Sequence, residues 1–228
     1  MNDKLPNCAK CSVKLSERAC RKENGKGPAF CPTLYKKEII EKSLQEYEHL
    51  EIKEFARQAS IQEAQGYGDK ELGYARVRPI KPRIVEVMEF AQKMGYKRLG
   101  LVFCIGLRKE AQAVEMVFSK WGFEVVSVVC KAGRTPKEKI GIRDDQKIAI
   151  GQFESMCNPI MQAMVLNDSK TDFNVVMGLC VGHDSLFLKY AEAPCTVLAV
   201  KDRLLGHNPL AAIYNIDSYY RSLKNRPS

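Results

Sequence analysis

The sequence lacks any long hydrophobic run. In 228 residues, the longest apolar stretches, such as residues 173–181, fall far short of a membrane span, which takes roughly 20 apolar residues. Residues 1–7 also lack the apolar segment of a secretory signal and lead straight into a cysteine motif. With neither feature present, we expect a cytoplasmic protein that has no membrane partner.

The sequence also lacks the motifs of several enzyme classes. It contains no phosphate-binding P-loop, no G-x-G-x-x-G, no G-x-S-x-G and no H-E-x-x-H. Nucleotide hydrolysis on a P-loop, dinucleotide binding, α/β-hydrolase chemistry and zinc-protease chemistry therefore gain no support from motifs. No internal repeat or low-complexity tract is present. The sequence names no reaction and does not indicate an oligomeric state.

The charge of the chain favours an anionic partner. The net charge is +9, which suits a small anionic ligand. The densest basic run consists of Arg76, Arg78, Lys81 and Arg83 and has no interleaved aromatic side chains. No nucleic-acid-binding motif accompanies it, so we interpret this run as a solvated connector and do not expect a nucleic-acid partner.

Histidine is scarce, with three residues, whereas cysteine is abundant, with nine. An odd number of cysteines does not suit a simple disulfide framework. Cytosolic thiols stay reduced, so cysteines there more often bind metals or take part in chemistry. The cysteines divide into an N-terminal group of four, a second group of four, and one remaining residue, Cys195.

The N-terminal group predicts a metal-binding module over residues 1–35. Its spacing is C-x2-C-x8-C-x10-C, and the segment has few large apolar side chains to fold around. Four thiolates suit zinc or an iron–sulfur cluster, and a structural zinc contributes on the order of 10 kcal/mol or more. The proline after the fourth cysteine also occurs in bacterial ferredoxin motifs. The four predicted ligands are Cys8, Cys11, Cys20 and Cys31.

The remainder of the chain predicts a helical linker region and an α/β domain. Residues 36–82 contain one or two amphipathic helices followed by a Gly- and Pro-containing loop over 66–82. From residue 83, helical patterns alternate with short β-branched or apolar runs. This alternation predicts a small, open, mostly parallel Rossmann-like sheet of about four strands. The predicted strands are 99–103, 124–129, 174–179 and 196–200.

The second cysteine group falls where predicted strands end or helices begin. Ligands bind beyond the carboxyl ends of parallel strands, so we expect these four thiols at one rim of the sheet as a candidate site for a second cluster or metal. They are Cys104, Cys130, Cys157 and Cys180. His183, Asp184 and His207 follow strands on the same rim and are the candidate ligands or catalytic acid–base groups. The alternative for each cysteine is a small buried hydrophobe, the role we assign to Cys195.

Such a rim suits redox or sulfur-transfer chemistry on a small anionic substrate. The alternative is a non-catalytic sensor or binding protein whose rim thiols hold a metal or a small ligand. Whether the chain is an enzyme stays open at this point.

Several segments together resemble a known family. They are the N-terminal cysteine motif, FCIGL at 103–107, CNPI at 157–160, GLCVGHDSLF at 178–187, and residues 200–203 through 206–209. These segments resemble the bacterial and archaeal proteins that share the domain of unknown function numbered 1847. The resemblance covers nearly the whole chain. It implies metal binding and no established reaction.

Overall fold

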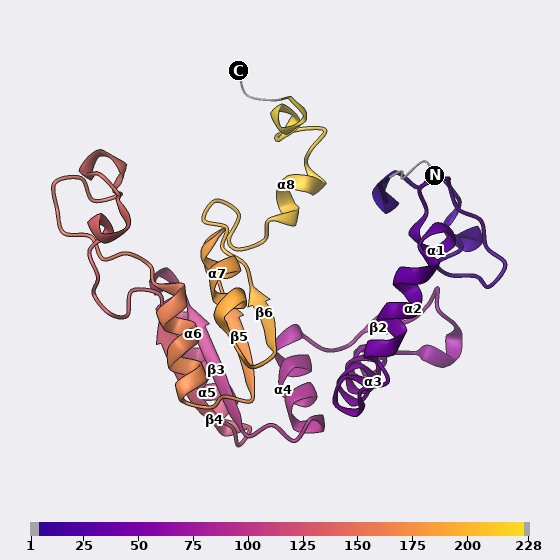
Figure 1. Ribbon diagram of the computed structural model, residues 1–228, viewed down its shortest axis with the longest axis horizontal. Helices are drawn as coiled ribbons and strands as arrows, with labels where there is room; N and C mark the ends of the chain where they lie inside the picture. Colours follow the sequence, from indigo (N-terminus) through magenta and orange to yellow (C-terminus); the bar gives the residue numbers. More distant parts are fainter. Residues whose placement is uncertain (1–4, 226–228) are drawn as a thin grey trace. The chain divides into compact units, whose positions relative to one another are not determined.

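The computed structural model describes residues 5–225 and divides the chain into two compact units, Met1–Ala64 and Gln65–Ser228 (Figure 1). No helix within residues 5–225 is long and apolar enough to cross a membrane.

A four-stranded parallel sheet forms the centre of the second unit. The strands are β3 (Arg98–Phe103), β4 (Glu124–Val129), β5 (Phe173–Met177) and β6 (Cys195–Ala199). Their order across the sheet is β4-β3-β5-β6, and every neighbouring pair is parallel. The predicted α/β class and parallel sheet are therefore confirmed.

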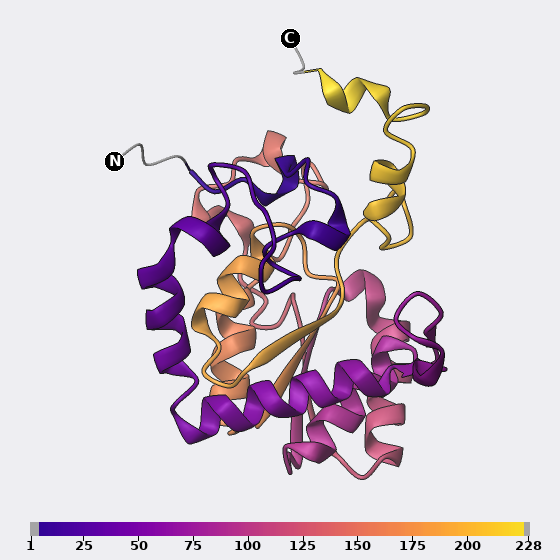
Figure 2. The ribbon, with the colours of Figure 1, turned by 90° about the vertical axis from the view of Figure 1, so that its right-hand side faces the viewer.

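Helices cover both faces of this sheet. They are α4 (Arg83–Lys93), α5 (Arg108–Lys120), α6 (Pro159–Asp168) and α7 (His183–Tyr190). The short α8 (Leu210–Tyr214) follows and has no buried residue. Strand β4 lies on one side of β3 and β5 lies on the other, so the crossover from β3 to β4 and the crossover from β4 to β5 run in opposite directions across the sheet. Right-handed crossovers therefore place α5 on one face and α6 on the other. Helix α7 packs beside α6 (Figure 2).

The hydrophobic core lies between the sheet and these helices. All five residues of β5 are buried, as expected for a central strand covered on both faces. Phe118 of α5 and Phe187 of α7 are among the largest fully buried side chains. The buried Gln162 of α6 donates from Nε2 to the carbonyl of Val128 at 2.7 Å, so it holds α6 against the end of β4.

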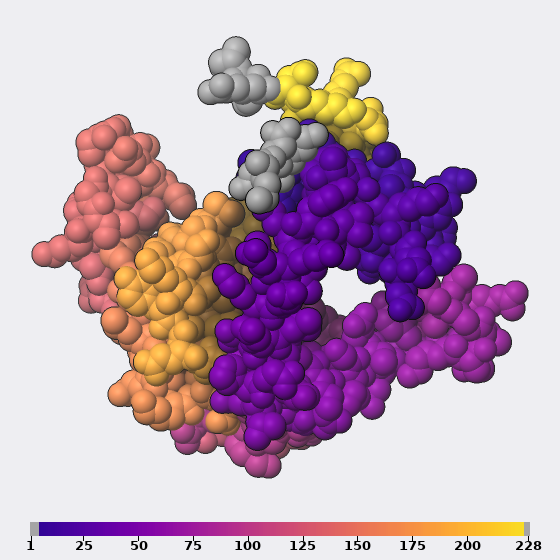
Figure 3. All heavy atoms as spheres, turned by 45° about the vertical axis from the view of Figure 1, so that its right-hand side comes forward, coloured from indigo at the N-terminus to yellow at the C-terminus, as the bar shows by residue number. Residues whose placement is uncertain are grey.

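A long loop over residues 131–156 joins β4 to α6 and stands out from the body of its unit (Figure 3). Its two ends are held together at a neck. Met156 donates its backbone N–H to the carbonyl of Thr135 at 2.7 Å, and Asn158 donates to Cys130 at 2.8 Å. The neck brings the end of β4 and the start of α6 side by side.

Residues 66–82, predicted as a loop, contain a two-residue antiparallel pair. It consists of β1 (Tyr67–Gly68) and β2 (Arg78–Pro79). The basic run of residues 76–83 therefore includes one of these short strands and leads into α4.

The first unit contains α1 (Pro32–Tyr35), α2 (Lys37–Glu46) and most of α3 (Leu50–Gln65). Among its described residues, 5–64, only Gln62 is buried. The unit therefore has no apolar core, and burial alone gives it little stability.

Candidate functional site

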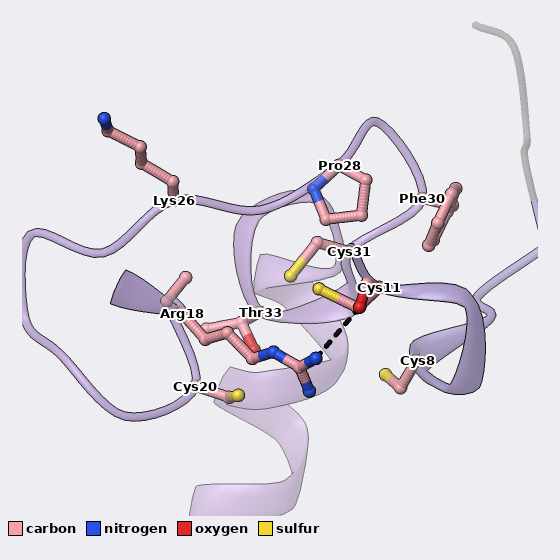
Figure 4. A pocket seen from close by; sticks show the side chains of 10 residues that line it. Cys8, Cys11, Arg18, Cys20, Lys26, Pro28, Phe30, Cys31 and Thr33 are labelled. Carbon is pink, nitrogen blue, oxygen red and sulfur yellow. Dashed lines mark hydrogen bonds between the residues drawn. The ribbon is translucent and has the colours of Figure 1, made fainter. Parts of the chain in front are cut away.

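The four N-terminal cysteines line one cavity of about 50 Å³ (Figure 4). Cys8 begins a single 3-10 turn, Cys8–Lys10, and its carbonyl accepts the backbone N–H of Cys11 at 3.1 Å. The Cys11 thiol lies beside that of Cys31, and the Cys8 thiol stands apart from both (Figure 4). Cys31 stands directly before α1, where Pro32 occupies the first turn of the helix.

Two basic side chains share this cavity with the thiols. Arg18 donates to the carbonyl of Cys11 from Nη2 and to that of Val13 from Nε, both at 2.9 Å. Its guanidinium reaches into the space between the Cys8 and Cys20 side chains (Figure 4). Lys26 also lines the cavity.

The carboxyl edge of the sheet brings together three thiols of the second group. Phe103 of β3 is the register partner of Val129 of β4, and Cys104 and Cys130 are the next residue on each strand. The N–H of Cys130 donates to the carbonyl of Phe103 at 2.9 Å, which continues the pairing. Cys157 joins them because the loop neck ties Asn158 to Cys130.

These three residues form the three-thiol site. The Cys130 thiol lies between those of Cys104 and Cys157, and its single S–H can donate to one of them at a time. Its sulfur also accepts the N–H of Ile105 at 3.4 Å. Cys104 and Cys130 are only 7% and 3% exposed, whereas Cys157 is intermediate. Cys157 is therefore the thiol most open to a reagent.

The hydrogen bonds separate the three thiols by acidity. The bond from Cys130 is the main cause that lowers the pKa of Cys104 to about 5, helped by the N–H of Gly106 and the charge of Lys201. The same donor lowers the pKa of Cys157 to about 6, with help from the charges of Lys131 and His183. Donation of its one S–H, to Cys104 or to Cys157, raises the pKa of Cys130, as does burial. The site therefore favours thiolates at its two ends and a thiol in its centre.

The other predicted rim residues make different contacts. The sulfur of Cys180 accepts a hydrogen bond from Nη2 of Arg203 at 3.0 Å. The carboxylate of Asp184 accepts the N–H of Ser185 at 2.8 Å. Nδ1 of His207 accepts the N–H of Asp202 at 3.1 Å. Of the three predicted acid–base groups, His183 is the one whose charge acts on a thiol of the site.

Two lysines also belong to the site, although neither was among the predicted site residues. Lys131 directly follows Cys130, and Lys201 comes two residues after β6. The adjacency of Lys131 to a strand-end cysteine was a visible signal. Cys195, in contrast, packs against the core, and its thiol donates to the carbonyl of Ala193 at 3.3 Å.

Within residues 5–225, no group of three or more cysteine, histidine or acidic side chains is placed so that it could hold a metal ion. The donor set of the N-terminal cavity nevertheless fits a metal, since four thiolates are the ligands of many structural zinc sites. Metal ligation therefore stays a prediction for both cysteine groups.

The model of a family described as "Protein of unknown function (DUF1847)" matches residues 31–198. The chain belongs to this family. It is also 42% identical, over 185 residues, to "Uncharacterized protein MJ0455" of Methanocaldococcus jannaschii. That alignment covers 81% of this chain and 87% of the relative. The DUF1847 match includes the three-thiol site and begins at Cys31, so the first three N-terminal cysteines lie outside it. The family is thus confirmed, and its name assigns no chemistry.

The helix cap beside Cys157 leads to a testable prediction. Asn158 caps α6, and its Oδ1 accepts the N–H of Met161 at 3.0 Å. Asn158→Ala removes this acceptor and is expected to lower the free energy of unfolding by about 1 kcal/mol. Asn158→Asp keeps an acceptor and is the matched control. Urea denaturation of both variants checks the prediction, and equal losses would contradict the capping role.

Proposed function

We propose that this chain is a reactive-cysteine protein that carries out redox or sulfur-transfer chemistry on a small anionic substrate, with Cys157 as the nucleophile. The observation that carries the proposal is the three-thiol site, in which one central thiol lies between two others and can donate its S–H to either. A cysteine needs its thiolate form to react. Hydrogen bonds to Cys104 and Cys157 favour that form at both ends of the site.

The position of the site in the fold supports this proposal. Strands β4 and β5 lie on opposite sides of β3, so the crossovers leave the sheet in opposite directions beside β3. Crevices at such points are the usual ligand sites of open parallel sheets. Cys104 follows β3 directly. Cys157 precedes the first turn of α6, where the helix dipole favours negative charge.

The charges around the thiols support an anionic substrate. Lys131 and His183 act on Cys157, and Lys201 acts on Cys104. Cationic groups that favour a thiolate also attract an anionic ligand before it reacts. His183 is our candidate for proton exchange at Cys157. Asp184 and His207, which bond elsewhere, stay candidates for acid–base roles after substrate has bound.

We propose a structural role for the N-terminal cysteines. The four ligands would be Cys8, Cys11, Cys20 and Cys31, which would hold zinc or an iron–sulfur cluster. The bound metal would crosslink a unit that has no apolar core to stabilise it. Binding would have to draw the four thiolates in around the ion, and Arg18 and Lys26 offset their negative charge. All nine cysteines are free thiols, which suits the reducing cytoplasm that we propose for this protein.

The pH dependence of alkylation tests the proposed nucleophile. The alkylation rate of Cys157 by iodoacetamide is expected to rise with pH around a midpoint near 6, instead of the ordinary value of 9.0. Below the midpoint the thiol is protonated and slow, and above it the thiolate reacts. Mass spectrometry of digested protein follows each cysteine separately. The groups that face Cys157 and set this midpoint are Cys130, Lys131, His183 and Cys104.

Cys195 is the internal control for this measurement, because burial raises the pKa of its thiol. It is expected to react only at higher pH. A Cys157 midpoint at or above that of Cys195 would refute the proposed nucleophile. The same samples, prepared without oxygen, test the cluster alternative. Visible absorption that is lost on replacing Cys104 and Cys180 with serine would assign a cluster to the rim instead.

A further inference from the structure

The three-thiol site contains two thiols, Cys104 and Cys130, in addition to the proposed nucleophile. Building on the proposed function, we propose that Cys157 and Cys130 form a reversible disulfide as the site reduces a small anionic disulfide, and that Cys104 accepts the proton that Cys130 releases. The substrate class is a low-molecular-weight disulfide that carries carboxylates.

Exposure sets the order in which the thiols react. Cys157 is intermediate in exposure, while Cys104 and Cys130 are almost fully covered. An incoming disulfide therefore meets Cys157 first. Cys130 is positioned to attack next because its thiol already hydrogen-bonds to that of Cys157.

The backbone around these two residues suits a disulfide. Asn158 donates its N–H to the carbonyl of Cys130 at 2.8 Å, so the backbone at Cys157 runs directly beside that at Cys130. Disulfides join residues whose Cα atoms are roughly 4.4–6.8 Å apart, a separation that such backbone neighbours reach. The neck of the loop at residues 131–156 thus sets the two thiols beside each other.

The reaction balances in two steps. In the first, the Cys157 thiolate attacks one sulfur of the substrate R–S–S–R, which forms a Cys157–S–S–R mixed disulfide and releases RS⁻. In the second, the Cys130 thiol passes its proton to the Cys104 thiolate and attacks the Cys157 sulfur. The disulfide bond between the Cys157 sulfur and the SR group breaks, and a second RS⁻ leaves. One disulfide is reduced to two thiolates while Cys130 and Cys157 are oxidised to one disulfide.

The central position of Cys130 explains why its thiol needs a partner base. Its pKa is raised because its one S–H donates to Cys104 or to Cys157. A protonated thiol is a poor nucleophile. Cys104 is the neighbour that is still a thiolate after Cys157 has reacted, so it is the acceptor to which the Cys130 proton can move as the Cys130 sulfur attacks.

The substrate class follows from charge and from access. Lys131 and His183 act on the thiol that meets the substrate. Lys131 also donates to the carbonyl of Ser155 at the loop neck, and it lies 3.9 Å from Oε1 of Glu154. Cys157 therefore lies between the neck and the core, where a small molecule has better access than a protein disulfide.

The test uses the reduced full-length chain and 5,5′-dithiobis(2-nitrobenzoate), an anionic disulfide. In the wild type, the site is expected to release two thionitrobenzoate ions, one in each step, and Cys157 is expected to appear in a Cys130–Cys157 disulfide by peptide mapping. In Cys130→Ser, Cys157 is expected to release one ion and to keep a stable mixed disulfide. Cys130→Ala repeats the test should serine destabilise this buried position. Cys195→Ser is the matched control and should behave as the wild type.

Two further variants test the assigned roles. Cys104→Ala should keep the first step and slow the second, with the second step now accelerating as pH rises. Lys131→Met should lower the advantage of the anionic probe over the neutral 2,2′-dithiodipyridine, by about tenfold for one lost charge contact. Both rates are normalised to those of a free small thiol. An unchanged ratio would overturn the anionic substrate class.

The outcomes separate this inference from the proposed function. A wild-type mixed disulfide that persists at Cys157 would overturn the Cys130 step, while the nucleophilic role of Cys157 would stand. A Cys104–Cys130 disulfide as the first product would overturn the order of reaction. Failure of Cys157 to react at all would overturn both proposals.

Discussion

Removal of the metal that we propose for the N-terminal unit is expected to unfold residues 5–35 while the sheet unit stays folded. None of residues 5–35 is buried, so hydrophobic burial contributes little to their stability. A structural four-thiolate metal supplies on the order of 10 kcal/mol or more, which is the largest single contribution that we propose for this chain. Chelation under reducing conditions should therefore abolish hydrogen-exchange protection in residues 5–35.

The single tryptophan reports on the other unit during the same experiment. Trp121 caps the end of α5, so its fluorescence follows the sheet unit and should not change on chelation. Cys20→Ser removes a proposed ligand and should reproduce the effect of chelation, whereas Cys195→Ser should retain bound metal. Full protection of residues 5–35 in metal-free protein would show that the module folds without an ion.

The strands were predictable because β-branched and apolar runs bounded by glycine mark buried parallel strands. The errors are at the ends. The third strand was predicted to reach Leu179, but β5 ends at Met177. Gly178 has a φ of 65°, which takes the chain out of the extended region. Leu179 is still buried, which is why the apolar run extended beyond the strand.

The candidate site was predicted at the level of the sheet edge but not at the level of contacts. Strand order places residues on an edge, and this brought Cys104 and Cys130 together. The backbone hydrogen bond between Thr135 and Met156 brings Cys157 to the sheet edge. No sequence pattern in the 26-residue loop over 131–156 predicts this hydrogen bond. The contact between Arg203 and Cys180 likewise depends on how the segment after β6 folds back.

Phe187→Ala is expected to lower the free energy of unfolding of the sheet unit by about 3–5 kcal/mol. Phe187 of α7 is 0% exposed. It belongs to the buried cluster that includes Cys104 and Cys130, and Cys157 packs against the same cluster. Removing the ring leaves a cavity beneath the thiols. Urea denaturation followed by Trp121 fluorescence measures the loss.

Leu188 is the matched control, since it is the next residue of α7 and is 45% exposed. Leu188→Ala should change the free energy of unfolding by less than about 1 kcal/mol. A similar loss in both variants would indicate a general effect on the helix instead of a cavity.

Because the cluster also covers Cys104 and Cys130, Phe187→Ala should make their alkylation faster even in folded protein. Chelation should leave their alkylation unchanged. The buried cluster, and not the metal, would then be what holds the three thiols in the order that their chemistry requires.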